Sequence, residues 1–179
     1  MLYNDVRRDQ FYRKKEIFEM NYTIRPLKLT EYGLLEDFLY EAIFIPEGVQ
    51  APPRDIIDLP ELQVYIKDFG KQNGDAAFAA EVNGKVVGAV WVRIMNDYGH
   101  IDDDTPSFAI SLYKEYRGNG IGTALMREML SNLKNCGYKT ASLAVQKANY
   151  AVKMYKKLGF RIIDENTEEY IMLNRLDEV

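Results

Sequence analysis

The sequence is short of the features that mark secreted, membrane-spanning and nucleic-acid-binding proteins. Its one cysteine, Cys136, excludes an internal disulfide and fits a reducing compartment. No apolar run approaches the roughly 20 residues that a membrane-spanning helix needs. The formal net charge of −4 is the opposite of the basic excess with which proteins bind nucleic-acid phosphates. Because the charged first residues also lack the apolar segment of a secretory signal, we expect a cytoplasmic protein without membrane or nucleic-acid partners.

Groups of metal-ligating residues are missing too. The single histidine, His100, lies near three consecutive aspartates, Asp102–Asp104, but such a run in a polar connector is most often a solvated loop. We therefore expect no metal site. Cys136 continues the apolar stripe of a predicted helix, so we expect it in the core rather than as a nucleophile.

The order of the predicted elements indicates one domain of mixed α/β fold over residues 20–179. Residues 1–19 have no clear period and form a predicted N-terminal extension. Asn83-Gly84, between two strand-forming segments, is a strong hairpin signal. Thr30 is the predicted N-cap of the first helix. The predicted strands are 21–26, 76–82, 85–95, 107–113, 140–145, 160–164 and 170–173, and the predicted helices are 31–44, 59–69, 121–136 and 149–158.

The segment YRGNGIGTALM, residues 116–126, places three glycines between a predicted strand and a predicted helix. The first amides of a helix have no acceptor within it, and the helix dipole adds partial positive charge at that end. Gly118, Gly120 and Gly122 therefore predict a phosphate site, to which Arg117 can add a charge-assisted hydrogen bond. A dinucleotide-binding loop needs a third glycine where this chain has Thr123, and no Gly-Lys-Ser/Thr of a nucleotide-triphosphate loop is present.

The spacing Arg117-x-x-Gly120-x-Gly122 closely resembles the acyl-CoA diphosphate loop of the GNAT N-acetyltransferase superfamily. The opening NYTIRPL and the later AVKMYKKLGF, with Tyr155, extend the resemblance over about residues 21–173. The resemblance implies acetyl-CoA as the cofactor and a mixed, mostly antiparallel sheet flanked by helices, with a splayed central strand pair. It also allows a homodimer.

The resemblance carries roles onto particular residues. The backbone amides of Leu112 and Tyr113 would bind the pantetheine arm, and one of them would polarise the thioester carbonyl. Asn149 would lie beside the arm. The diphosphate would be held by Arg117 and by the amides of Gly118, Asn119, Gly120, Ile121, Gly122 and Thr123.

Tyr155 matches the family's tyrosine near the cofactor sulfur, where a phenol still protonated at neutral pH can protonate the leaving thiolate. Many relatives carry a glutamate where this chain has Phe108, so the general base is absent, replaced by water, or supplied by the connector before that strand. We prefer Asp104, which precedes the strand most closely. The other candidates are Asp97, His100, Asp102 and Asp103.

These features predict direct transfer of an acetyl group to a primary amine of a small molecule. The acceptor pocket would be built from Phe44–Ile57, the connector after Met95 and the hairpin around Glu165–Glu169. Acetylation of a protein N-terminus or a lysine, and acyl-CoA binding without catalysis, remain alternatives. In the simplest alternative, the glycines form only a tight turn and Tyr155 is a core aromatic whose hydroxyl has a partner.

Overall fold

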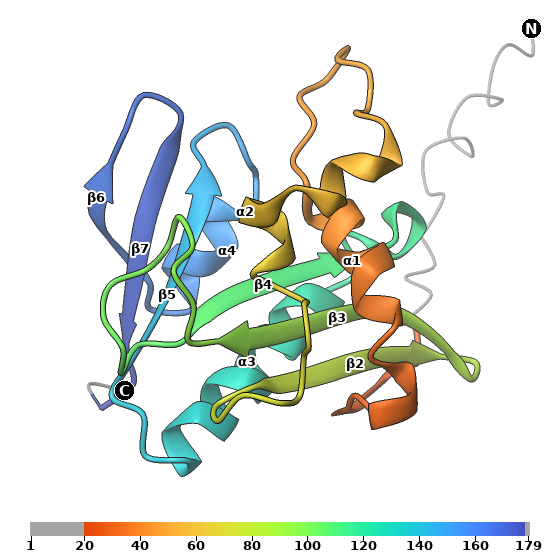
Figure 1. Ribbon diagram of the computed structural model, residues 1–179. Coiled ribbons are helices and arrows are strands. Elements are labelled where there is room, and N and C mark those ends of the chain that lie inside the picture. The colour runs from red at the N-terminus through yellow and green to blue at the C-terminus, as the bar shows by residue number, and fades with distance from the viewer. Residues whose placement is uncertain (1–19, 178–179) are drawn as a thin grey trace, which may run out of the picture.

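The computed structural model describes residues 20–177, which form one open seven-stranded sheet with helices on both faces (Figure 1). The predicted extension, residues 1–19, lies outside the described residues. The strand order is β1-β2-β3-β4-β5-β7-β6, and every neighbouring pair is antiparallel except β4 and β5. The predicted mixed, mostly antiparallel α/β fold is therefore confirmed.

The described strands follow the predicted ones closely, whereas α1, α2 and α4 are shorter than the predicted helices. The strands are β1 Thr23–Pro26, β2 Ala76–Val82, β3 Lys85–Arg93, β4 Ser107–Leu112, β5 Thr140–Gln146, β6 Arg161–Glu165 and β7 Glu169–Arg175. The α-helices are α1 Leu34–Ala42, α2 Pro60–Gln63, α3 Ile121–Asn135 and α4 Val152–Lys157, and short 3-10 helices cover Leu29–Glu31, Arg54–Asp58 and Lys114–Tyr116.

The hairpin between β2 and β3 forms as its turn sequence predicts. Asn83 and Gly84 have φ angles of 50° and 79°. This left-handed pair matches the twist of the flanking strands, and Gly84 adopts it without steric cost. Val82 pairs with Lys85 across the turn.

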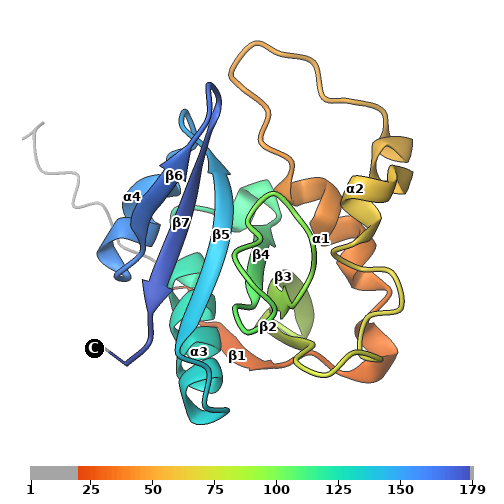
Figure 2. The same cartoon turned by 60° about the vertical axis from the view of Figure 1, so that its left-hand side comes forward.

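Helices lie on both faces of the sheet (Figure 2), and each face carries its own hydrophobic core. Helices α3 and α4 cover one face, where Leu125, Met129 and Phe160 are buried. Helix α1 and the segment around α2 cover the other, where Phe38 packs in one cluster with Trp91. Side chains alternate along each strand, so β4 contributes Phe108 to the first core and Ala109 to the second.

Two local predictions about the helices are wrong because side chains form hydrogen bonds with backbone groups near the predicted helix ends. Thr30 does not cap α1: the chain first makes a 3-10 turn, in which the Glu31 carboxylate accepts the Lys28 N–H at 2.9 Å. The predicted helix 59–69 ends at Gln63, since the carbonyls of Val64 and Lys67 accept hydrogen bonds from Arg93 at 3.1 and 2.7 Å.

Cys136 is exposed, contrary to the expectation that it lies in the core. The apolar stripe of α3 ends at Leu133, and Cys136 is the C-cap residue, where the chain turns away through Gly137 at φ 87°. Among residues 20–177 no helix is long and apolar enough to cross a membrane, and no cluster of three potential metal ligands occurs.

The central strands β4 and β5 begin side by side and then diverge (Figure 1). Their register contains the single pair Ser107 and Ser142, supported by the Ser142 N–H bonding to the Pro106 carbonyl at 2.9 Å. Beyond that point the two strands separate towards the C-terminal end of β4. The predicted splayed pair is therefore confirmed, and it leaves one edge of β4 open next to the glycine-rich turn.

Candidate active site

The glycine-rich turn presents a row of unpaired backbone donors. Within the described chain, the amides of residues 118–123 have no intramolecular acceptor, and the first bonded amide is that of Ala124, which donates to the Gly120 carbonyl at 3.1 Å. Gly118 and Gly120 have φ angles of 79° and 80°, a conformation that L side chains rarely adopt. No heavy atom lies within 4 Å of a Cβ built at either glycine. The donors therefore face open space at the positive end of the 15-residue helix α3.

A cavity of about 790 Å³ connects this turn with the C-terminal half of β4 and with the segment that leads into α4. It brings together eight of the predicted site residues: Leu112, Arg117, Gly118, Gly120, Gly122, Thr123, Asn149 and Tyr155. Asn119 is exposed and Ile121 is buried in the core, and neither lines the cavity. Both residues can contribute to the turn only through their amides.

The open edge of β4 offers different amides from those predicted. The Tyr113 N–H donates to the Val87 carbonyl at 3.0 Å, so its amide is already used by β3. Because main-chain groups alternate along a strand, the amides of Ile110 and Leu112 point to the other edge, towards β5. The prediction that the Tyr113 amide binds the arm is therefore wrong, whereas binding of the arm by the Leu112 amide stays a prediction. The Ile110 amide was not predicted, although the alternation of main-chain groups along a strand places it on the same edge as the Leu112 amide.

Arg117 occupies a different place from the predicted one. Its Nε donates to the Leu112 carbonyl at 2.8 Å, and its Nη2 donates to the Glu41 carbonyl at 3.1 Å and pairs with the Glu41 carboxylate at 2.9 Å. The guanidinium therefore ties the end of β4 to α1, instead of lying free over the glycine turn. Glu41 was not predicted, since no sequence signal links it to a residue 76 positions away.

Asn149 fixes the start of the α4 segment. Its Oδ1 accepts the Ala151 N–H at 2.9 Å, and its own N–H donates to the Gln146 carbonyl at 2.9 Å. The residue therefore positions the turn that brings Tyr155 to the cavity.

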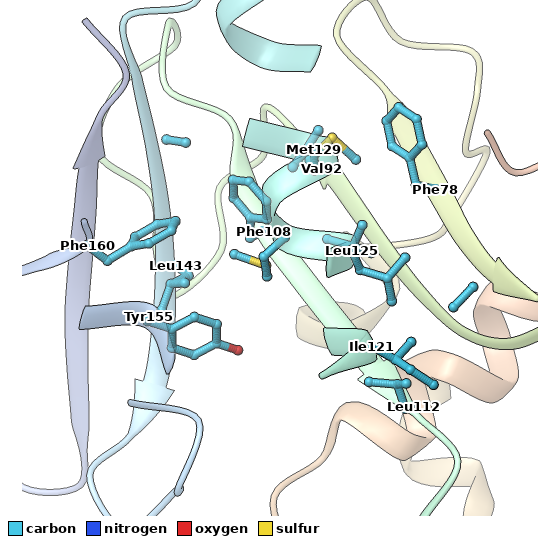
Figure 3. Packing of buried hydrophobic residues seen from close by; sticks show 14 of the residues in the cluster. Phe78, Val92, Phe108, Leu112, Ile121, Leu125, Met129, Leu143, Tyr155 and Phe160 are labelled. Carbon is cyan, nitrogen blue, oxygen red and sulfur yellow. The ribbon is translucent and has the colours of Figure 1, made fainter. Parts of the chain in front are cut away.

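Tyr155 is buried, and its ring packs against Phe160 with centroids 5.9 Å apart. Its hydroxyl points away from Phe160 towards the β4 side (Figure 3) and makes no hydrogen bond within residues 20–177. Burial, with a smaller contribution from Tyr150, raises the pKa of Tyr155 above its ordinary value. The phenol is therefore protonated at neutral pH, and its O–H has no hydrogen-bond partner among the described residues.

The predicted base, Asp104, lies outside this cavity. Its side chain is exposed, and its N–H donates to the Asp102 carboxylate at 3.0 Å, in a turn that faces solvent. Phe108, at the position where many relatives have glutamate, is buried edge-on against Phe160 at 5.8 Å. Among the connector's other candidates, the Asp97 carboxylate accepts a hydrogen bond from Ser107 at 2.7 Å.

A smaller hollow of about 290 Å³ adjoins the main cavity and was not predicted. Thr123, Tyr150 and Met154 line both. The smaller hollow also carries three exposed cationic side chains, those of Arg127, Lys153 and Lys157. Lys153 and Lys157 are four residues apart along α4 and so share one face of the helix, a spacing that the sequence already contained.

The chain resembles known acetyltransferases over most of its length. The model of the family described as "Acetyltransferase (GNAT) family" matches residues 39–160. The N-alpha-acetyltransferase of Sulfurisphaera tokodaii is 33% identical over 114 residues, which are 58% of this chain and 68% of that relative.

Solved structures share the fold at lower identity. The PaiA N-acetyltransferase of Thermoplasma acidophilum, crystallised with coenzyme A, superposes with a TM-score of 0.65 and 19% identity over 87% of this chain and 99% of that one. The spermidine/spermine N-acetyltransferase of Vibrio cholerae gives a TM-score of 0.61 and 19% identity over 88% and 95% of the two chains.

Proposed function

The chain belongs to the acetyltransferase (GNAT) family, an acetyl-CoA-dependent N-acetyltransferase family, and we propose that it transfers the acetyl group directly to the primary amine of a small molecule. The observation that carries this proposal is the run of unpaired amides at residues 118–123, next to an open strand edge. Coenzyme A offers a diphosphate for the first feature and an amide-containing arm for the second. The residues present therefore fit the group.

The roles of the chain's own residues follow from the geometry. The amides of the glycine turn bind the diphosphate, and the Leu112 and Ile110 amides bind the arm along β4. A donor of this kind, held rigidly by the strand, stabilises negative charge on a thioester oxygen. Bound acetyl-CoA supplies the activated acyl group. Tyr155, protonated and without a partner, donates its proton to the departing sulfur.

The smaller hollow supports the same ligand. Coenzyme A carries a 3′-phosphate on its ribose as well as its diphosphate. The cations Arg127, Lys153 and Lys157 lie beside the glycine turn and are suited to that second phosphate.

The segment between α1 and α2 supports a small acceptor. Its residues Ile43–Glu47 line the cavity together with Val49 and Ala51. The segment is held back against α1, because the Tyr40 hydroxyl donates to the Pro52 carbonyl at 2.6 Å and Arg54 pairs with Asp37. An apolar wall with Glu41 and Glu47 in it is suited to an amine with a short hydrocarbon part.

A protein N-terminus is the second candidate acceptor. The 33% identity with an N-alpha-acetyltransferase favours it. A single assay distinguishes the two acceptors: acetyl-CoA consumption with alaninamide, spermidine, alanine, and short peptides that offer either a free N-terminus or only a lysine amine. Turnover of the small amines supports our proposal, and turnover of the peptides alone supports the second candidate. Tight binding of acetyl-CoA without turnover of any acceptor would indicate a non-catalytic module.

Two further expectations belong to the proposal. We place the protein in the cytoplasm on the grounds of its lone cysteine. A homodimer stays a prediction, which sedimentation velocity of the full chain would test.

A further inference from the structure

The last carbonyl on the open edge of β4 is already used by a side chain. Each residue of a strand directs its N–H and its C=O to the same edge, and the Tyr113 N–H bonds to Val87 on β3. The main-chain groups of Ile110 and Leu112 therefore face the other edge, from which β5 diverges. Of these groups, the Leu112 carbonyl accepts the Arg117 Nε–H at 2.8 Å. The open edge thus ends in a guanidinium rather than in a free carbonyl.

Three hydrogen bonds hold this guanidinium at the end of the strand. Besides the bond to Leu112, its Nη2 donates to the carbonyl and to the carboxylate of Glu41, at 3.1 and 2.9 Å. Glu41 lies in the last turn of α1, where carbonyls lack partners within the helix and favour a cation. The Arg117 side chain is therefore fixed by acceptors on two elements, the end of β4 and the end of α1.

The pair of Arg117 and Glu41 faces the space in which the proposed carrier would lie. Both side chains line the cavity of about 790 Å³, together with Leu112, Ile110 and Tyr155. The two side chains are 30% and 23% exposed, so a ligand in the cavity can contact them. Because the carboxylate compensates the guanidinium, the pair adds no net charge beside the glycine turn. A ligand N–H can pair with the Leu112 carbonyl only if it displaces the guanidinium.

The groups left free on this edge decide where an extended ligand can pair. They are the Leu112 N–H and the two main-chain groups of Ile110. The pattern repeats every second residue, so a paired ligand can shift along the strand only in steps of roughly 7 Å. A displacement of even about 1 Å at a reacting centre can cost a factor of about 100 in rate. Since Tyr155 has a fixed place in the cavity wall, a shift of one step would separate a thioester from its hydroxyl.

We propose that Arg117, held by Glu41, is a positioning residue that sets the register in which the pantetheine arm pairs with β4. Arg117 covers the Leu112 carbonyl, so the arm pairs from the Leu112 N–H inwards and the register one step nearer the glycine turn is blocked. This inference rests on the proposed function, since it concerns the same carrier. It gives the arginine of the motif a role that does not involve the diphosphate.

The test replaces both partners, Glu41→Gln together with Arg117→Met, so that the net charge beside the glycine turn stays the same. The blocked register then becomes available and offers one more hydrogen bond, to the Leu112 carbonyl. Calorimetry should show coenzyme A binding about fivefold tighter, the effect of one net hydrogen bond. The control ligand is 3′-phosphoadenosine 5′-diphosphate, which keeps the phosphates and lacks the arm, so its Kd should not change.

Steady-state kinetics provide a second measurement on the same double variant. Carrier bound in the shifted register is unproductive, so kcat and the KM for acetyl-CoA should both fall about fivefold while kcat/KM stays the same. Ser111→Ala is the matched structural control, because it removes another bond between β4 and α1, from the Ser111 hydroxyl to the Phe38 carbonyl at 2.6 Å, without uncovering the strand edge. This control should lower Tm without the parallel decrease in kcat and KM.

Each of the other outcomes is informative. Weaker binding of both ligands by the double variant would indicate that Arg117 contacts the diphosphate, and would overturn the inference. Unchanged binding of coenzyme A, or a lower kcat without a lower KM, would leave the pair as a structural link only and would overturn it as well. Failure of the wild type to acetylate any amine would contradict the proposed function instead, and calorimetry would still test the inference.

Discussion

At the scale of single residues, some side chains make contacts in the structure that differ from those predicted from the sequence. Arg117 and Glu41 form a half-buried ion pair, so the arginine of the motif links α1 to the end of β4. Tyr155 lines the cavity, and its place beside the cofactor sulfur stays a prediction. Its hydroxyl lacks a partner among the described residues, unlike that of a core tyrosine with a structural role.

Tyr155→Phe should lower kcat about 100-fold and leave the Kd for acetyl-CoA unchanged, because only proton donation to the thiolate is removed. The variant should keep its Tm, since the hydroxyl makes no hydrogen bond whose loss would destabilise the fold. Steady-state kinetics, calorimetry and thermal unfolding measure the three quantities. Unaltered kcat with an acceptor that the wild type acetylates would refute the role of Tyr155, and a lower Tm alone would indicate a core tyrosine.

At the scale of elements, the site depends on how α3 and α4 begin. The glycine turn directs amides into the cavity, and the Asn149 side chain fixes the turn that leads into α4. Each of these features is local in sequence, and each can be removed without disturbing the sheet.

Gly120→Val should weaken acetyl-CoA binding at least 100-fold, because a β-branched residue resists the left-handed conformation that directs the amides. Gly84→Val is the matched control. Gly84 has φ 79° against 80° for Gly120, and no heavy atom lies within 4 Å of an added Cβ at either position. Both variants should lose similar stability, but only Gly120→Val should lose binding in calorimetry. Normal binding by Gly120→Val would contradict the phosphate site.

Lys153→Ala should weaken coenzyme A binding by roughly fivefold, about 1 kcal/mol for an exposed charge contact, and should leave the binding of 3′-dephospho-coenzyme A nearly unchanged. The reason is that Lys153 lines the smaller hollow beside the glycine turn. Lys139→Ala makes the same charge change at an exposed residue that follows α3. Equal effects of Lys153→Ala on the binding of the two ligands would contradict the assignment of the 3′-phosphate to the smaller hollow.

At the scale of the whole molecule, ion pairs join segments that are distant in sequence. Arg25 on β1 pairs with Glu31 at 2.7 Å and with Glu81 on β2 at 2.7 Å. Arg93 and Asp75 form a pair in which both side chains are at most 2% exposed, and it holds the turns after α2 against β3. Removing one partner of a buried ion pair leaves the other charge buried and uncompensated, which lowers the free energy of unfolding.

The Glu31 contacts predict how stability depends on pH. The hydrogen bond from Arg25, opposed by burial and helped by the Lys28 amide, lowers the pKa of Glu31 from 4.5 to about 2. A folded-state pKa below the unfolded value stabilises the fold fully above about pH 4.5, and the contribution disappears as the pH falls towards 2.

We expect Glu31→Gln to lower the free energy of unfolding by about 1–2 kcal/mol at pH 7, and by almost nothing near pH 2. Urea unfolding of both proteins at a series of pH values measures the difference. Asp103→Asn, at an exposed connector residue, is the matched control for the loss of one carboxylate. A Glu31→Gln difference that did not shrink on acidification would contradict the ion pair.

The sequence by itself determined the features that depend on neighbouring residues. Asn83-Gly84 specifies its turn because left-handed φ angles are a property of two residues. The spacing of Gly118 and Gly120 before α3 specifies free amides, because the first turn of any helix lacks internal acceptors. The order of strands and helices and the position of the glycine-rich turn follow from such local rules.

Only the tertiary structure decided which groups face the site. The Tyr113 amide is used by Val87 on β3, and the Arg117 guanidinium pairs with Glu41 on α1. In the connector, the carboxylate that bonds to Ser107 of β4 is that of Asp97, whereas Asp104 is exposed. Each outcome depends on a partner that lies at least ten residues away in the sequence. No local pattern encodes such a pairing, because it arises when the sheet and its two helical layers pack together.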